Sequence, residues 1–136
     1  MLSTSFNQSF LHFWLLVLRI SASGMMLTHG FPKFMKIIEG NMQFGDPFGI
    51  GAGASLVLAA FAEFICSILI ILGLATRWAV IPLIITMATA AFLVHGSDPF
   101  GKQELPILYL LIYITLLITG GGKYSLDQGI GKKGRF

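Results

Sequence analysis

The chain has 136 residues, of which 55% are hydrophobic and only 11% are charged, with a formal net charge of +3. Soluble domains carry roughly 25% charged residues, so this composition excludes a water-soluble globular protein. The length predicts one domain over residues 1–136, with the lipid bilayer as its principal partner and no nucleic acid among its partners.

Four apolar runs are candidates for membrane-spanning helices, because each has close to the ~20 residues that a bilayer requires. Backbone in contact with lipid must satisfy its own hydrogen bonds, which leaves helices or a closed barrel. The runs lack the alternating polar pattern of barrel strands. We therefore predict an all-α fold, an integral membrane four-helix bundle, with helices at about residues 10–31, 54–74, 78–95 and 103–120.

Proline and glycine mark the ends of these runs. Pro32 follows the first run, Gly73 closes the second, and Pro106 is placed in the first turn of the fourth. The predicted connections are loops at residues 32–53 and 96–102, followed by a tail at residues 121–136.

The basic residues predict the orientation of the bundle. Lys and Arg are enriched on the cytoplasmic side of membrane proteins. One end of the predicted bundle carries five of them (Arg77, Lys123, Lys132, Lys133 and Arg135), and the other carries three (Lys33, Lys36 and Lys102). Both termini are therefore predicted to be cytoplasmic, with both loops outside. Residues 1–9 hold no Lys or Arg, so we expect the first run to be retained rather than cleaved as a signal peptide.

The sequence offers no intrinsic cofactor or metal site. Cys66 is the single cysteine, which excludes an intramolecular disulfide and a Cys-x-x-Cys pair. The three histidines are too scattered for a metal cluster of the usual spacing.

Arg19 and Glu63 are the two charges inside apolar runs, where each costs roughly 2.5–3.5 kcal/mol. Counted from the outer ends of the first two helices, both lie about 14–15 Å deep. They are expected to meet, as an ion pair that fixes helix register or as the polar floor of a ligand or proton site. The remaining alternative is that Arg19 extends towards the inner surface while Glu63 stays protonated.

Further polar side chains gather near the outer ends of the predicted helices. His29, Lys33, His95 and Glu104 lie at nearly one level, and Tyr109 lies on the fourth helix. These features indicate an outward-facing pocket, although a histidine at a helix end can also be a cap or an interface residue. The candidate lining residues are Arg19, His29, Lys33, Glu63, His95, Glu104 and Tyr109. No catalytic residue can be named.

The tetrapeptide Asp-Pro-Phe-Gly occurs twice, at residues 46–49 and 98–101, each time before an apolar run. The echo indicates either two hairpins related as a parallel repeat or two similar turns. In both cases Asp46 and Asp98 are predicted to be turn residues at helix starts.

The order of these polar residues resembles the DoxX family. The resemblance is carried by LRI at 18–20, HGFPKF at 29–34, AEFICSILIILGLATRWA at 62–79, His95, ELPILYL at 104–110 and GGGKYSLD at 120–127. It covers roughly residues 12–128. It implies a four-helix, multi-pass protein of the bacterial inner (plasma) membrane, and it matches Arg19, His29, Lys33, Glu63, Arg77, His95 and Glu104 to the family's polar positions.

The resemblance implies two hypotheses of function, since relatives are linked to thiosulfate:quinone oxidoreductase and to oxidoreductase complexes. In the first, the chain is a membrane subunit of a redox-linked complex that holds a quinone or an oxidised sulfur species in the outward pocket. In the second, it is a non-catalytic accessory or scaffold subunit. Its partners are then other subunits or further copies of the chain. Whether it turns over a substrate stays open.

Overall fold

The structure, a computed structural model, describes residues 4–133, and side chains as far as residue 131. Within this range every regular element is helical: α1 (Gln8–Ile38), α2 (Ala52–Ala60), η1 (Phe61–Cys66), α3 (Ser67–Leu72), α4 (Thr76–Thr89), η2 (Ala90–Val94), α5 (Phe100–Thr119) and α6 (Leu126–Lys133). The elements η1 and η2 are π-helical.

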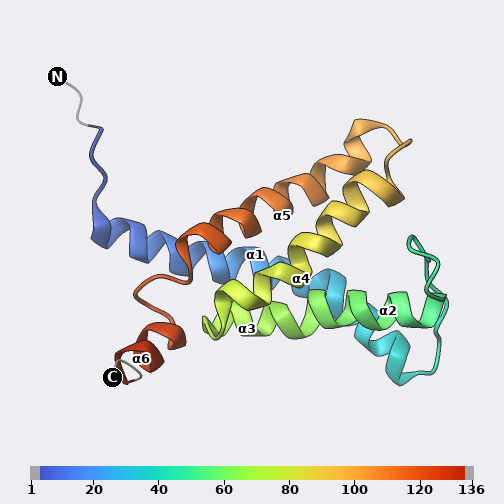
Figure 1. The fold of residues 1–136 in the computed structure, drawn as a ribbon, viewed down its shortest axis with the longest axis horizontal. Coiled ribbons are helices and arrows are strands. Elements are labelled where there is room, and N and C mark those ends of the chain that lie inside the picture. The colour runs from blue at the N-terminus through green and yellow to red at the C-terminus, as the bar shows by residue number, and fades with distance from the viewer. Residues whose placement is uncertain (1–3, 134–136) are drawn as a thin grey trace.

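The helices form four spans that are long and apolar enough to cross a bilayer. They cover residues 8–38, 52–72, 76–94 and 100–119. The predicted all-α fold with four spans is therefore confirmed, and the last three spans lie within about three residues of their predicted bounds. Both termini lie at the same end of the bundle (Figure 1). We call this the terminal end and the opposite one the loop end. Which end faces the cytoplasm stays a prediction.

The first helix is longer than predicted. We expected it to end before Pro32, but α1 continues for seven further residues to Ile38, with Pro32 inside it. Proline removes one backbone hydrogen bond but does not prevent a helix from continuing when packing supports it. The support comes from Phe34, whose ring stacks on that of Phe64 at 4.5 Å between centroids. The loop at the loop end consequently comprises residues 39–51 rather than 32–53.

The second and third spans each contain a π-helical segment in their middle or final turns. In η1 and η2 the wider turn adds residues without ending the span. Such π-bulges change the direction in which the following side chains point, and they are frequent at functional sites. Glu63 lies within η1, and His95 directly follows η2.

The bundle consists of two hairpins that diverge. The first hairpin is formed by α1 with α2, η1 and α3, and the second by α4 and η2 with α5. Figure 1 shows the hairpins crossing near the middle of the molecule and separating towards the loop end. The contacts between them are made mainly by α4 with η1 and α3, and to a smaller extent by α1 with α5. The core therefore lies at the crossing, around Ile70, Leu83 and Leu116, which are fully buried.

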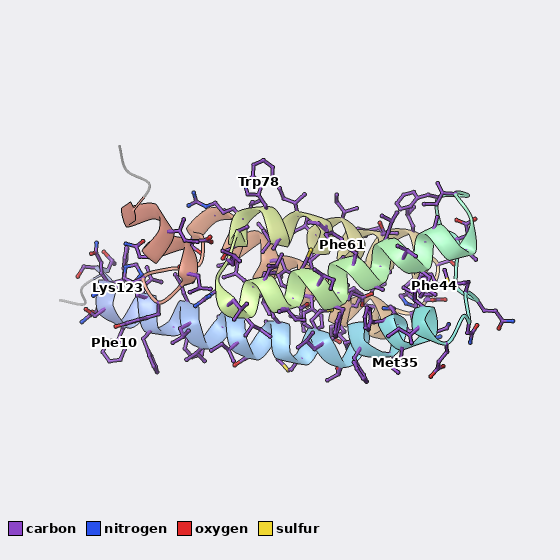
Figure 2. All side chains as sticks on the ribbon, turned by 90° about the horizontal axis from the view of Figure 1, so that it is seen from below. Phe10, Met35, Phe44, Phe61, Trp78 and Lys123 are labelled. Carbon is purple, nitrogen blue, oxygen red and sulfur yellow. The ribbon has the colours of Figure 1, made fainter. Side chains whose placement is uncertain are left out.

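The outside of the bundle is apolar. Figure 2 shows Phe10 and Trp78 projecting away from the helices, and Trp78 is 78% exposed. Apolar side chains in contact with lipid tails lose nothing by exposure, unlike those in water. The exterior is that of a helical membrane protein.

Residues 120–127, which include the start of the predicted tail, fold back against the terminal end. The Asp127 carboxylate accepts hydrogen bonds from the backbone N–H groups of Ala75 (2.6 Å) and Thr76 (2.9 Å), at the start of α4. The Asp127 N–H donates to the Gly73 carbonyl at 2.9 Å. Gly73 has a φ of +72°, and a Cβ there would come within 2.1 Å of the Arg19 guanidinium. Only glycine fits this turn.

Candidate ligand cavity

Glu63 is held in the middle of the bundle by the backbone around it. Glu63 is 3% exposed. The backbone of η1 approaches α1 so closely at Gly30 that a Cβ there would lie 2.4 Å from the Glu63 carbonyl. The Glu63 carboxylate forms an ion pair with the Lys33 ammonium, one turn further along α1. Gly30 thus brings the second span close enough for the charge in η1 to meet a partner on α1.

The predicted contact between Arg19 and Glu63 is wrong. Arg19 instead donates hydrogen bonds to the carbonyls of Ile70 (3.2 Å) and Ile71 (3.5 Å), and to that of Tyr124 in the tail. The depth count took the first helix to end near His29. Because α1 continues to Ile38, Lys33 rather than Arg19 lies level with Glu63. The carbonyls that Arg19 binds lie seven and eight residues after Glu63 on the second span, or roughly 10–12 Å closer to the terminal end.

A cavity of about 420 Å³ lies between the hairpins at the loop end. We call it the polar lobe, because two histidines, two lysines, Glu63 and Tyr109 contribute to its wall. The His29 ring meets the Tyr109 ring edge to face, with centroids 6.2 Å apart. The residues that line the polar lobe are Met26, His29, Lys33, Glu63, Met87, Ala90, His95, Gly101, Lys102, Leu105, Pro106 and Tyr109.

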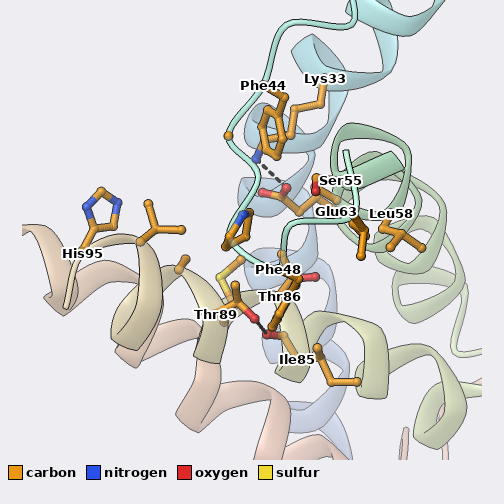
Figure 3. A pocket seen from close by; sticks show the side chains of 17 residues that line it. Lys33, Phe44, Phe48, Ser55, Leu58, Glu63, Ile85, Thr86, Thr89 and His95 are labelled. Atoms are coloured by element: carbon orange, nitrogen blue, oxygen red, sulfur yellow. Dashed lines mark hydrogen bonds and ion pairs between the residues drawn. The ribbon is translucent and has the colours of Figure 1, made fainter. Parts of the chain in front are cut away.

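A second cavity of about 390 Å³ adjoins the first, and we call it the apolar lobe. It lies between α2 and α4, under the loop at residues 39–51. The two lobes share Lys33, Glu63, Met87, Ala90 and His95. Its further lining residues are Phe44, Gly45, Pro47, Phe48, Ile50, Ser55, Leu58, Ala59, Ile85, Thr86, Thr89 and Val94. Figure 3 shows the Lys33–Glu63 ion pair with the Phe44 and Phe48 rings beside it.

The loop over the apolar lobe is fixed at Asp46 and at Phe44. Asp46 accepts hydrogen bonds from the N–H groups of Ile50 and Gly51, both at 2.9 Å, and from the Ser55 hydroxyl at 3.0 Å. These bonds, that of Gly51 above all, hold the pKa of Asp46 below its ordinary value. Two residues earlier, the Phe44 ring lies 5.9 Å from the ammonium groups of Lys33 and Lys36.

The aspartates of the two Asp-Pro-Phe-Gly segments have different hydrogen-bond partners. Asp46 binds the backbone ahead of α2, as predicted for a turn residue at a helix start. Asp98 instead pairs with His95, whose Nδ1 lies 2.8 Å from the carboxylate. The hydrogen bond from His95 holds the pKa of Asp98 below its ordinary value. His95 is also fixed through its carbonyl, which accepts a hydrogen bond from the Gln103 side chain at 2.8 Å.

The structure brings together five of the seven predicted site residues. His29, Lys33, Glu63, His95 and Tyr109 all line the polar lobe. Glu104 is exposed on α5 and lines neither lobe. Arg19 lies at the terminal end.

Sequence reasoning missed the residues that form the apolar lobe, such as Phe44, Leu58 and Ile85. Apolar side chains in an apolar sequence carry no signal of their own. The aromatic residues of the loop, Phe44 and Phe48, could have been noticed, because a loop in water has no ordinary need for them.

These features define a class of protein: a four-span helical membrane protein with two adjoining cavities that meet at a partly buried ion pair. The chain belongs to the DoxX family, whose sequence profile matches residues 14–96. The predicted family is thus confirmed.

Individual relatives extend the similarity over most of the chain. An uncharacterised protein of Haemophilus influenzae is 34% identical over 132 residues, covering 89% of this chain and 93% of that protein. CatD of Bacillus subtilis, whose name assigns it provisionally to the oxidoreductases, is 35% identical over 121 residues, covering 87% and 89%. The inner membrane protein YphA of Escherichia coli is 32% identical, covering 84% and 88%. The chain is a multi-pass protein of the bacterial inner membrane. No solved structure matches it.

Proposed function

We propose that the chain is the quinone-binding membrane subunit of a redox-linked complex. One observation carries the proposal: a polar lobe and an apolar lobe adjoin each other and share Lys33, Glu63 and His95 in their walls. A quinone has a ring with two carbonyl acceptors and an isoprenoid tail, so it requires donors at one end of its site and apolar surface at the other. Cavities of about 390 and 420 Å³ each lie within the range of ordinary ligand sites, about 300–1,000 Å³.

The polar lobe supplies the donors for the ring. His29, Lys33, His95 and Tyr109 carry N–H or O–H groups in its wall. Fixed partners orient two of them, since Lys33 is paired with Glu63 and His95 with Asp98. Donors that are already oriented bind an acceptor at a smaller entropic cost.

The apolar lobe gives the ligand access from the bilayer. Leu58 and Ile85 line this lobe, yet they are 58% and 56% exposed. Both lie in spanning helices whose exposed surface faces lipid, so the lobe opens sideways between α2 and α4. A lipid-soluble tail can therefore remain in contact with the membrane while the ring enters the polar lobe. A small oxidised sulfur anion would contact the polar lobe alone. The apolar lobe would then have no role in binding.

The relatives support the redox link only in part. CatD carries a provisional oxidoreductase name, and the inner-membrane relatives carry no activity in theirs. This chain has no cysteine pair, so the proposal assigns the electron donor to a partner subunit.

The test is the binding of a short-chain ubiquinone analogue to the purified protein in lipid nanodiscs. Leu58→Trp places a large ring in the apolar lobe and should abolish binding or weaken it by about tenfold or more, which corresponds to about 1.4 kcal/mol. Leu111→Trp is the matched control, because Leu111 is 57% exposed on α5 and lines neither lobe. It should bind like the wild type.

Two results would contradict the proposal. Equal binding by Leu58→Trp and the wild type would place the quinone elsewhere. Absence of binding to the wild type, in a protein that co-purifies with a larger membrane complex, would favour the accessory subunit instead. Displacement of the analogue by thiosulfate would show that the polar lobe also accepts a sulfur anion.

A further inference from the structure

The last helix, α6, lies at the terminal end and outside the four spans (Figure 1). Its first residues attach it to the bundle: Asp127 binds the start of α4, and the Gln128 N–H donates to the Ser125 hydroxyl at 3.3 Å. Further along, α6 has open space beside it, because a Cβ added at Gly129 or Gly131 would meet no atom within 4 Å. Most of its surface is therefore available to a partner other than the bundle.

An apolar stripe on α6 is left exposed. Leu126 and Ile130 are four residues apart, which places them on one face of the helix, and they are 50% and 57% exposed. Isolated helices shorter than about 12–15 residues are marginal in water. α6 has eight residues, two of them glycine, which is a poor helix former. A helix of this length and composition requires a surface that takes up its apolar stripe.

Aromatic side chains show where the membrane surface lies at this end. Trp14 and Trp78 lie within the first two turns of α1 and α4, and both are exposed. Tyr124 is exposed as well, whereas Tyr109 and Tyr113 are buried in the bundle. Exposed Trp and Tyr side chains gather at the level of the lipid headgroups. Because α6 begins two residues after Tyr124, it starts at that level.

Positive charge is concentrated around α6. Lys132 and Lys133 belong to its last turn, and Arg77 and Lys123 are exposed at the same end of the bundle. Of the six acidic residues in the chain, only Asp127 belongs to the terminal end, and its carboxylate is already bound to the backbone of α4. Among the side chains that the structure describes, no carboxylate pairs with Arg77 or Lys123. The terminal end thus carries cations without counterions at the headgroup level.

From these observations we infer that α6, together with Arg77 and Lys123, binds the anionic phospholipid headgroups of the leaflet at the terminal end. An amphipathic helix with basic residues lies in the plane of the interface, with its apolar stripe between headgroups and acyl chains. Each basic residue near an anionic membrane surface strengthens binding by about fivefold. An acidic partner protein would match the charges but would not account for an apolar stripe at the headgroup level. Lipid binding by α6 is independent of the proposed quinone site.

The test is hydrogen–deuterium exchange of the whole protein, in nanodiscs of phosphatidylcholine alone and of phosphatidylcholine mixed with phosphatidylglycerol. The amides of residues 128–133 should exchange more slowly, by about tenfold or more, in the anionic nanodiscs. High salt should remove this difference, because it screens exposed charges. Mass spectrometry of the peptides measures both effects.

Matched variants separate charge from helix formation. Lys132→Gln/Lys133→Gln should remove the difference between the two lipids, although Gln and Lys have similar helix propensities. Lys132→Arg/Lys133→Arg keeps both charges and should keep the difference. Leu126→Ser/Ile130→Ser removes the apolar stripe and should make residues 128–133 exchange rapidly in both lipids.

Three results would overturn the lipid site. Equal exchange of residues 128–133 in the two lipids would show that α6 does not recognise anionic headgroups. A difference that persists in Lys132→Gln/Lys133→Gln would show that the basic residues of α6 do not bind them. Slow exchange that appears only when another protein co-purifies would assign α6 to a protein partner. Absence of quinone binding to the same preparation would leave the lipid site unchanged.

Discussion

At the scale of single residues, the ion pair between Lys33 and Glu63 is unequal. The Glu63 side chain is 4% exposed, while that of Lys33 is 25% exposed. A long lysine side chain can reach water or the lipid headgroups when it loses its partner, but the Glu63 carboxylate cannot. The buried Glu63 carboxylate therefore requires Lys33 as its partner. Lys33 does not require Glu63 in the same way, and its ammonium group compensates the negative charge of Glu63 in the cavity.

This inequality predicts unequal effects of mutation. Lys33→Met leaves a buried carboxylate without a partner and should lower the free energy of unfolding by roughly 3 kcal/mol, at the lower end of values for broken buried pairs. Glu63→Gln should cost less, and Lys33→Met/Glu63→Gln should cost less than the sum of the two. Reversible unfolding in SDS measures all three. Equal losses in both single variants, with additivity in the double one, would show that the pair has no energetic coupling.

Arg19 provides the control for that cycle. Its partners are backbone carbonyls about 10 Å further along the second span, so its effect should be independent of Glu63. Arg19→Gln and Glu63→Gln should add within about 0.5 kcal/mol in the same SDS unfolding experiment. A coupling energy above that value would indicate a direct contact between Arg19 and Glu63, in disagreement with the structure.

At the scale of elements, the segment at residues 120–127 joins parts of the chain that are distant in sequence. It caps α4 through Asp127, holds Arg19 through the Tyr124 carbonyl, and meets α1 where the Lys123 N–H donates to His12 Nδ1 at 3.0 Å. The free N–H groups at the start of a helix require such acceptors. The two hairpins are thus fastened together at the terminal end, while they separate at the loop end.

Removing this cap should destabilise the bundle. Asp127→Ala should lower the free energy of unfolding by about 0.5–2 kcal/mol, the usual cost of a lost N-cap. Gln128→Ala, an exposed position one residue further on, should change it little. Unfolding in SDS again gives the comparison. Equal effects of the two substitutions would mean that the hydrogen bonds to Ala75 and Thr76 do not hold α4 in the membrane.

The elements also show how far the sequence alone can be interpreted. Hydropathy placed the four spans, and the positions of His29, Lys33, Glu63, His95 and Tyr109 predicted the polar lobe, because polar residues inside apolar runs stand out. The pairing of Glu63 was mistaken, since it depended on α1 ending near Pro32. The π-turns η1 and η2 carry no composition signal, and the folded tail depends on contacts 51 or 52 residues apart.

At the scale of the whole molecule, the proposed function depends on the unequal contacts between the two hairpins at the two ends of the bundle. Contacts at the crossing and at the terminal end fix one half of the bundle, and the divergence at the loop end creates both lobes. The loop held by Asp46 covers the apolar lobe without closing its side towards the membrane. A ligand from the bilayer can then reach a buried charge pair without the helices having to separate.

The most direct measurement of this account is mass spectrometry of the lipid-soluble ligands that remain bound to the protein after purification from its own membrane. The account predicts that a quinone is retained by the wild type and by Leu111→Trp and is lost from Leu58→Trp. No retained quinone in the wild type, or the same amount in all three proteins, would contradict it.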